Sequence, residues 1–168
     1  MPVMSTVLAI ALAATQAPPS PSRAGDTGAK GLVKETKHLK LTASANPRAS
    51  GPRGRVLLFI DVEPRPKMHV YAPDQEEYIP ITLTLTPDSA FTAQPVKYPP
   101  AETYFFAPLK ETQRVYSKPF RLEQPVTLAA TAAEAVTLRG TVRYQACDDA
   151  ICYVPQNVPV EWTIAIRR

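Results

Sequence analysis

The chain has 168 residues, of which 45% are hydrophobic and 20% are charged, and its formal net charge is +4. This length allows one domain with a buried core but hardly two. Lys and Arg residues are scattered, with no run longer than the terminal Arg167–Arg168 pair, so nucleic-acid binding is not expected. Nineteen prolines against six glycines disfavour long helices and favour short strands joined by stiff loops.

The N-terminal region is typical of an exported protein. Residues 1–17 contain an apolar stretch, Val7 to Ala14, followed by small residues, as in the hydrophobic region and cleavage site of a secretory signal peptide. No Lys or Arg precedes Arg23, so the usual charged start is missing. The stretch is too short for a typical transmembrane helix and nothing later is apolar enough. We therefore expect a periplasmic or otherwise exported protein without a transmembrane span of its own.

The remaining chain divides into a linker and one domain. Residues 18–32 are rich in Pro, Ser, Gly and Ala, which predicts a disordered linker, and the domain is expected over residues 33–168. Its hydrophobic residues alternate with a period of two, as in strands. The strands are predicted in residues 38–41, 55–62, 67–71, 79–85, 126–128, 136–146 and 158–166. In the absence of an amphipathic helix, this pattern predicts an all-β antiparallel sandwich.

The two long C-terminal strands each have one apolar face. In the first, these residues are Val136, Leu138, Val142, Tyr144 and Ala146, and in the second they are Val158, Val160, Trp162, Ile164 and Ile166. Residues 95–119 interrupt the pattern with five prolines and are expected to form a long loop. Its aromatic residues must pack against something, because leaving a large apolar side chain in water costs roughly 1.5–3 kcal/mol. The loop either fills the edge of the sandwich or covers a site.

The only two cysteines, Cys147 and Cys152, lie between the two long strands in the segment CDDAIC. They are expected at the neck of a β-hairpin whose turn is residues 148–151, where a disulfide is geometrically feasible. Because Cys147 follows Ala146, its side chain is expected to point away from the face that carries Val142 and Tyr144. It therefore should not lie in the main core.

The residues alone leave three interpretations of the pair open. A structural disulfide closing so short a loop stabilises by roughly 2 kcal/mol, which a sandwich of this size does not need. A redox pair is favoured by the tight hairpin, since strained bridges are easily reduced. A copper(I) site would combine both cysteines with Met68 and His69. Hydrolytic chemistry has little support, with two histidines and no GxSxG motif.

The segment YQACDDAICYVP resembles the end of the N-terminal periplasmic domain of the thiol:disulfide interchange protein DsbD. The residues that match are Tyr144, Gln145, Cys147, Cys152, Tyr153 and Pro155. The segment KMHVYAPDQEEYIPI resembles the stretch of this family in which two aromatic residues lie beside the cysteines. Tyr71 matches the second aromatic residue, and His69 stands in the place of the first.

This resemblance implies an immunoglobulin-like sandwich and an electron relay without a cofactor. It implies that Cys152 attacks the disulfide of a client and that Cys147 resolves the mixed disulfide. It also implies a cap loop over the cysteines, for which Tyr104, Phe105, Phe106 and Leu109 are the candidates. Asp148 and Asp149 are expected to raise the thiol pKa, and His69 or Tyr71 to assist proton transfer.

The expected partners are exported proteins that carry disulfides and a thioredoxin-like reductant acting in trans. The spacing of the two cysteines is one residue shorter than is usual in this family.

Taken together, the N-terminal region, the cysteine pair and the resemblance predict an exported thiol:disulfide exchange domain. A non-catalytic binding domain with a structural disulfide is the main alternative, and a copper-binding module is the third.

Overall fold

The structure is a computed structural model that describes residues 32–47, 53–75, 77–130 and 135–166. The predicted signal peptide and residues 18–31 of the predicted linker lie outside these residues. Within the described ranges all regular structure is β-strand, and all strand pairs are antiparallel.

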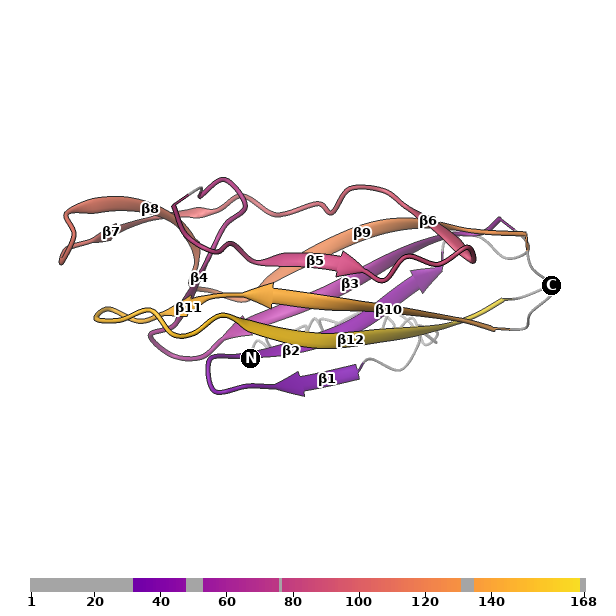
Figure 1. The fold of residues 1–168 in the computed structure, drawn as a ribbon, viewed down its shortest axis with the longest axis horizontal. Helices are drawn as coiled ribbons and strands as arrows, with labels where there is room; N and C mark the ends of the chain where they lie inside the picture. The colour runs from indigo at the N-terminus through magenta and orange to yellow at the C-terminus, as the bar shows by residue number, and fades with distance from the viewer. Residues whose placement is uncertain (1–31, 48–52, 76, 131–134, 167–168) are drawn as a thin grey trace, which may run out of the picture.

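The described strands form three sheets (Figure 1). A five-stranded sheet has the order β1 (Leu32–Glu35), β2 (Leu39–Pro47), β3 (Arg55–Pro64), β9 (Phe120–Leu128) and β6 (Phe91–Ala93). A three-stranded sheet consists of β12 (Gln156–Ala165), β10 (Ala135–Tyr144) and β5 (Thr82–Leu85). A four-stranded sheet consists of β11 (Ala146–Cys147), β4 (His69–Tyr71), β8 (Glu111–Tyr116) and β7 (Glu102–Phe106).

The main core lies between the five-stranded and three-stranded sheets. The period-two alternation sends every second side chain inward, and both predicted apolar faces are confirmed. Val136, Leu138, Val142, Tyr144 and Ala146 are buried, as are Val158, Val160, Trp162 and Ile164, and Ile166 packs against them partly buried. From the opposite sheet, β3 contributes Val56, Leu58, Ile60 and Val62 to the same cluster.

The predicted long loop over residues 95–119 is wrong in one respect, because it contains the β7–β8 hairpin. The five prolines of this segment are Pro95, Pro99, Pro100, Pro108 and Pro119, and all of them fall outside β7 and β8. The two strands pair from Glu102 opposite Val115 to Phe106 opposite Glu111. Proline density therefore marked the boundaries of these strands and did not exclude them.

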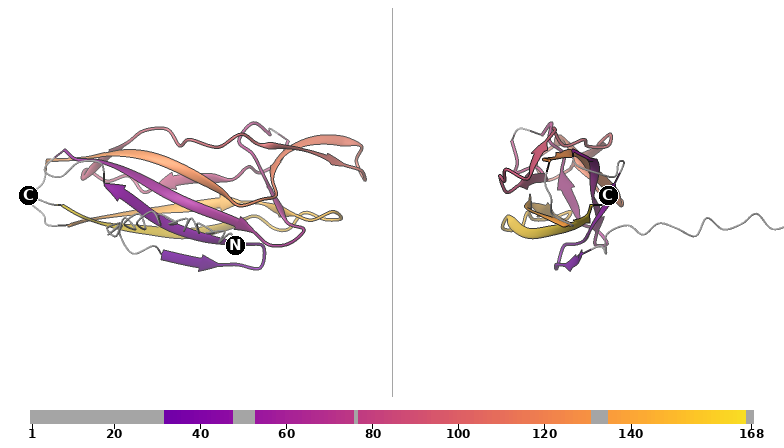
Figure 2. Two further views of the ribbon diagram at one scale, coloured as in Figure 1. Left: turned by 180° about the vertical axis from the view of Figure 1, so that it is seen from behind. Right: turned by 90° about the vertical axis from the view of Figure 1, so that its right-hand side faces the viewer.

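The small four-stranded sheet lies at one end of the sandwich. In Figure 1 the β7–β8 hairpin and the loop that follows β11 extend at the same end of the molecule, and the reverse view in Figure 2 agrees. The chain reaches this end by changing sheets after Tyr144. There β10 leaves its pairing with β12, and after Gln145 the chain pairs with β4 through Ala146 and Cys147.

Candidate functional site

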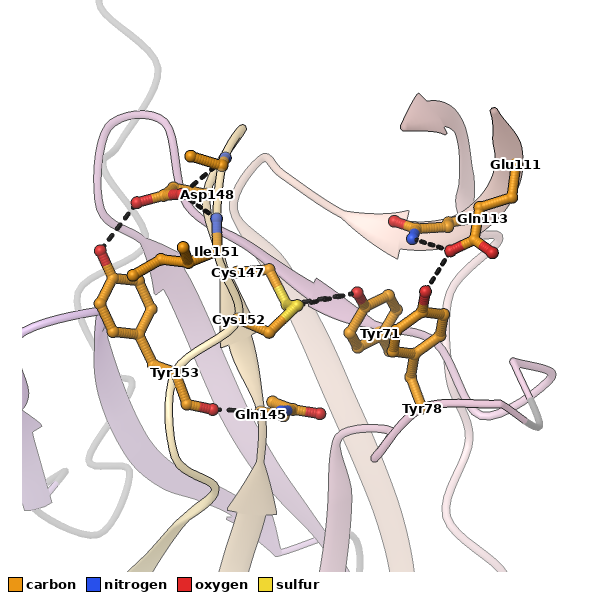
Figure 3. The surroundings of a disulfide bond; sticks show 11 residues. Tyr71, Tyr78, Glu111, Gln113, Gln145, Cys147, Asp148, Ile151, Cys152 and Tyr153 are labelled. Atoms are coloured by element: carbon orange, nitrogen blue, oxygen red, sulfur yellow. Dashed lines mark hydrogen bonds between the residues drawn. A yellow bond between two sulfur atoms is a disulfide. The ribbon is translucent and has the colours of Figure 1, made fainter. Parts of the chain in front are cut away.

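The two cysteines form a disulfide at the neck of the predicted hairpin (Figure 3). They face each other as an antiparallel bridge, and their Cα atoms are 4.0 Å apart. The turn is residues 148–151, as predicted, and the amide of Asp148 donates to the carbonyl of Ile151 at 2.9 Å. On the other side of the cysteine pair, the amide of Tyr153 donates to the carbonyl of Ala146 at 2.8 Å.

The two cysteines differ in their exposure to solvent. Cys147 is 1% exposed, whereas Cys152 is exposed. Cys147 lies outside the main core, as its position after Ala146 predicted. It is buried instead in a second cluster with Tyr71 and Val115, against which Tyr78 and Tyr104 pack. We call these five residues the tyrosine–cysteine cluster.

The pairing of β4 with β11 brings Tyr71 and His69 to the disulfide. Val70 pairs with Ala146 and His69 pairs with Cys147. Since side chains alternate along a strand, Val70 and Ala146 enter the main core. His69, Tyr71 and Cys147 therefore point to the other face, where the tyrosine–cysteine cluster forms.

Tyr71 is the residue whose hydroxyl group contacts both sulfur atoms. Its oxygen lies 3.2 Å from the Cys147 Sγ and 3.3 Å from the Cys152 Sγ. A disulfide sulfur has no proton, so the tyrosine hydroxyl is the donor. Burial raises the pKa of Tyr71 above its ordinary value, and the neighbouring Tyr78 and Glu111 raise it further. Tyr71 therefore remains protonated and able to donate at physiological pH.

His69 is buried beside the disulfide without a full set of hydrogen bonds. It is 3% exposed, and its Nε2 has no hydrogen-bond partner. Its ring lies 4.8 Å from that of Tyr104 and meets the Tyr71 ring edge-on at 5.8 Å between centroids. Burial lowers the pKa of His69, although Asp149 and Asp148 act in the opposite direction. His69 is therefore neutral at physiological pH.

The two aspartates of the turn accept hydrogen bonds that hold the turn and its neighbours. The Oδ1 of Asp148 accepts from the amides of Ala150 and Ile151, each at 2.8 Å. Its Oδ2 accepts from the hydroxyl of Tyr153 at 2.7 Å. The Oδ1 of Asp149 accepts from the hydroxyl of Tyr104 at 2.8 Å, which ties the β7–β8 hairpin to the cysteine turn.

The four candidate cap residues lie on this hairpin in different environments. Tyr104 belongs to the tyrosine–cysteine cluster, and Phe106 is buried with its ring 6.5 Å from that of Tyr104. Phe105 and Leu109 are 61% and 60% exposed and do not belong to the cluster. Tyr104 is therefore the cap candidate that the structure brings next to the disulfide.

Sequence reasoning missed three residues that lie behind Tyr71. The ring of Tyr78 stacks on the Tyr71 ring, with centroids 4.2 Å apart and planes 12° apart. The Tyr78 hydroxyl donates to a carboxylate oxygen of Glu111, and the Gln113 side-chain amide donates to the same oxygen at 2.7 Å. Gln113 is wholly buried. No local pattern marks these residues, because they come together only when β8 pairs with β4.

The proposed metal ligands are only partly brought together. His69 lies opposite Cys147, but both sulfur atoms belong to the disulfide. In the described part of the chain, no group of three or more His, Cys, Asp or Glu side chains is arranged to hold a metal ion. The same ranges contain no helix that is long and apolar enough to cross a membrane.

Comparison with known proteins identifies the family. Residues 36–162 match the family described as the N-terminal region of the thiol:disulfide interchange protein DsbD. A search of curated protein sequences finds no significant match. The structure resembles the N-terminal periplasmic domain of ScsB from Proteus mirabilis, with a TM-score of 0.56 and 16% identity, over 82% of this chain and 51% of that chain. The chain thus spans about half the length of that relative.

A second solved structure is the N-terminal domain of Neisseria meningitidis DsbD in the reduced form. It matches with a TM-score of 0.44 and 15% identity, over 75% of this chain and 86% of that chain. The predicted fold class, an all-β immunoglobulin-like antiparallel sandwich, is confirmed by the sheets and the family match. With the family match over most of its length and a disulfide at the matching cysteines, the chain belongs to the family of the N-terminal domain of DsbD, a family of thiol:disulfide exchange domains.

Proposed function

We propose that this protein is an exported electron relay, in which the Cys147–Cys152 pair passes electrons to disulfides of exported client proteins. The observation that carries the proposal is the asymmetry of the pair. Cys152 is exposed and Cys147 is 1% exposed. Thiol–disulfide exchange needs one sulfur that a partner can reach and a second that resolves the mixed disulfide.

In the first half of the cycle, the oxidised protein accepts two electrons from a thioredoxin-like reductant. A thiolate of the reductant attacks the Sγ of Cys152, the Cys147–Cys152 bond breaks, and Cys147 leaves as a thiolate. The second thiol of the reductant then attacks the mixed disulfide and releases Cys152. The reductant ends as a disulfide and this protein as a dithiol.

In the second half, the Cys152 thiolate attacks the disulfide of a client and forms a mixed disulfide. Cys147 then attacks Cys152, which restores the Cys147–Cys152 bond and releases the client as a dithiol. These steps require Cys147 to be close to Cys152 and shielded from other thiols, and its burial in the tyrosine–cysteine cluster supports that role.

Tyr71 is the residue that we expect to assist the departure of Cys147. A leaving thiol with a lower pKa leaves faster, and a hydrogen bond to the thiolate lowers the thiol pKa. The Tyr71 hydroxyl lies 3.2 Å from the Cys147 Sγ, which suits a donor to that thiolate. His69 is neutral and pairs with Cys147 between β4 and β11, so its uncharged imidazole ring packs on the same face as this cysteine.

The β7–β8 hairpin acts in this proposal as the cap over the disulfide. The hydrogen bond from Tyr104 to Asp149 and the packing of Tyr104 within the tyrosine–cysteine cluster support it. Phe105 and Leu109 are exposed, so in this state they are available to contact a partner rather than the sulfur atoms.

The first experiment measures the reduction potential of the pair, by equilibrating the domain with thiol buffers and counting alkylated cysteines by mass. A relay is expected between roughly −180 and −270 mV, the range of known exchange proteins. A value below about −300 mV would instead identify a structural disulfide and contradict the proposal.

The second experiment traps partners. In Cys147→Ala, Cys152 is the only cysteine left and a mixed disulfide with a client cannot be resolved, so covalent complexes should accumulate. The matched control is Cys152→Ala, which leaves only the buried Cys147 and should trap about tenfold less, because a buried thiol is poorly accessible. Equal trapping by the two variants would remove the assigned roles.

A further inference from the structure

Tyr71 contacts the disulfide, and its ring is in turn packed against residues that do not contact the sulfur atoms. Its ring is buried and meets the edge of the His69 ring on one side. The face of the Tyr71 ring is covered by Tyr78, stacked at 4.2 Å. The Tyr78 ring therefore limits the positions that the Tyr71 ring and its hydroxyl can take on this side.

Tyr78 lies in the segment between β4 and β5 and belongs to no strand, so no β-ladder fixes it. Its hydroxyl donates to the carboxylate of Glu111, the first residue of β8. The same carboxylate oxygen accepts from the Gln113 amide at 2.7 Å. Figure 3 shows this arrangement, with Tyr78 between Tyr71 and Glu111 and the Tyr71 hydroxyl directed at the disulfide.

The protonation states of Glu111 and Tyr78 favour the hydrogen bonds in which Glu111 accepts and Tyr78 donates. Hydrogen bonds from Tyr78 and then Gln113 lower the pKa of Glu111. The bond to Glu111, followed by burial, raises the pKa of Tyr78. Glu111 is therefore an ionised acceptor and Tyr78 a protonated donor at physiological pH, and a bond to an ionised acceptor is stronger than one between neutral groups.

We propose that Tyr78, held by Glu111, is a positioning residue that fixes the Tyr71 hydroxyl as a hydrogen-bond donor to the Cys147 sulfur, and thereby sets how readily Cys147 leaves. This inference rests on the proposed exchange function of the Cys147–Cys152 pair. Neither Tyr78 nor Glu111 contacts a sulfur atom, so their influence on the pair passes through Tyr71.

The test is the rate at which dithiothreitol reduces the disulfide. One dithiothreitol thiolate attacks Cys152, Cys147 leaves as a thiolate, and the second dithiothreitol thiol closes the oxidised ring. Tyr71→Phe should lower this rate about tenfold, because it removes one hydrogen bond to the leaving thiolate and so raises the activation free energy. Tyr78→Phe and Glu111→Ala break the same outer bond and should each lower the rate about threefold.

A double mutant separates positioning from general loosening. If Tyr78 acts through Tyr71, the Tyr71→Phe/Tyr78→Phe double variant should reduce as slowly as Tyr71→Phe alone. In the reduced protein, the ¹³Cβ resonance of Cys147 should titrate at higher pH in Tyr78→Phe than in wild type. Wild-type rates for both Tyr78→Phe and Glu111→Ala, or multiplicative losses in the double variant, would overturn the proposal.

Tyr116→Phe is the matched control. Tyr116 is also a buried tyrosine, and its hydroxyl donates to the carbonyl of Pro99 at 2.8 Å. Its loss removes a comparable hydrogen bond away from the disulfide, so the reduction rate should not change. Because the dithiothreitol assay requires neither the natural reductant nor a client, it stays informative if no client is ever trapped. Conversely, a trapped client together with wild-type rates in both Tyr78→Phe and Glu111→Ala would remove this inference alone.

Discussion

Asp148 has a structural role in the turn besides the effect on a thiol that its charge suggests. The sequence led us to expect that its carboxylate opposes a nearby thiolate. In the structure that carboxylate accepts hydrogen bonds from two turn amides and from Tyr153. These bonds lower the pKa of Asp148, first through the Ile151 amide, then Tyr153 and Ala150. Its carboxylate therefore holds the turn that presents Cys152.

The pH dependence of stability should report this role. Because the pKa of Asp148 is lower in the folded state than its ordinary value of 3.8, its ionised form stabilises the fold above that value, and this stabilisation is lost as the pH falls through the folded pKa. In urea titrations, Asp148→Asn should be less stable than wild type at about pH 6 and nearly equal at about pH 2.

Tyr153→Phe provides a graded comparison for this pH effect, since it removes one of the three donors to Asp148 and keeps the charge. Its stability deficit should be smaller than that of Asp148→Asn and should also shrink in acid. A gap between Asp148→Asn and wild type that stays constant from neutral to acidic pH would show that the carboxylate does not contribute through its charge.

At the scale of elements, the functional geometry depends on the passage of the chain from β10 to β11. The period of two continues through this passage, so Tyr144 and Ala146 remain in the main core while Cys147 faces the other way. The sequence pattern predicted this orientation. It did not predict β4 as the new neighbour, because pairing between distant strands is not encoded in local alternation.

The close approach of β5 to β10 leaves no room for a side chain at one position of β10, which is occupied by glycine. Gly140 pairs with Leu85 of β5, and a Cβ atom at this position would lie 2.9 Å from the carbonyl oxygen of Thr84. Gly140→Ala should therefore force β5 away and lower the free energy of unfolding by about 1–3 kcal/mol, measured by urea denaturation.

Thr137→Ala is the control for Gly140→Ala on the same strand. Thr137 is exposed, so its replacement should cost less than about 1 kcal/mol. Equal costs for the two variants would mean that β5 does not approach β10 as closely as described.

For the whole molecule, stability and redox chemistry reside in separate clusters. The main core contains residues from the five-stranded and the three-stranded sheets, including Leu58 and Trp162, but not Cys147. Cys147 belongs to the tyrosine–cysteine cluster at the end of the molecule. An exchange domain benefits from this separation, because the pair must change between disulfide and dithiol without unfolding the chain.

Reduction of the disulfide should therefore leave the protein folded. The disulfide closes a short loop, so its loss should lower the free energy of unfolding by at most about 2 kcal/mol, and the fluorescence of Trp162, the single tryptophan, should not change. Leu138→Ala, in the main core opposite Trp162, should cost about 2–5 kcal/mol in the oxidised protein. Global unfolding on reduction would indicate a structural staple and contradict the relay as well.

Local sequence patterns were sufficient to predict the fold class, the inward faces of the long strands, the cysteine hairpin and the orientation of Cys147 away from the main core. All of these follow from local alternation and turn chemistry, which neighbouring residues impose on one another. Tyr71 was found through the family resemblance, and His69 both through that resemblance and as a ligand of the alternative copper site. The burial of Cys147, the exposure of Cys152 and the placement of Tyr78, Glu111 and Gln113 behind Tyr71 became apparent from the packed structure. The burial of Cys147 and this arrangement depend on β4 packing between β11 and β8. Contacts between segments so far apart in the chain are specified by the packing of the whole molecule, not by any local stretch.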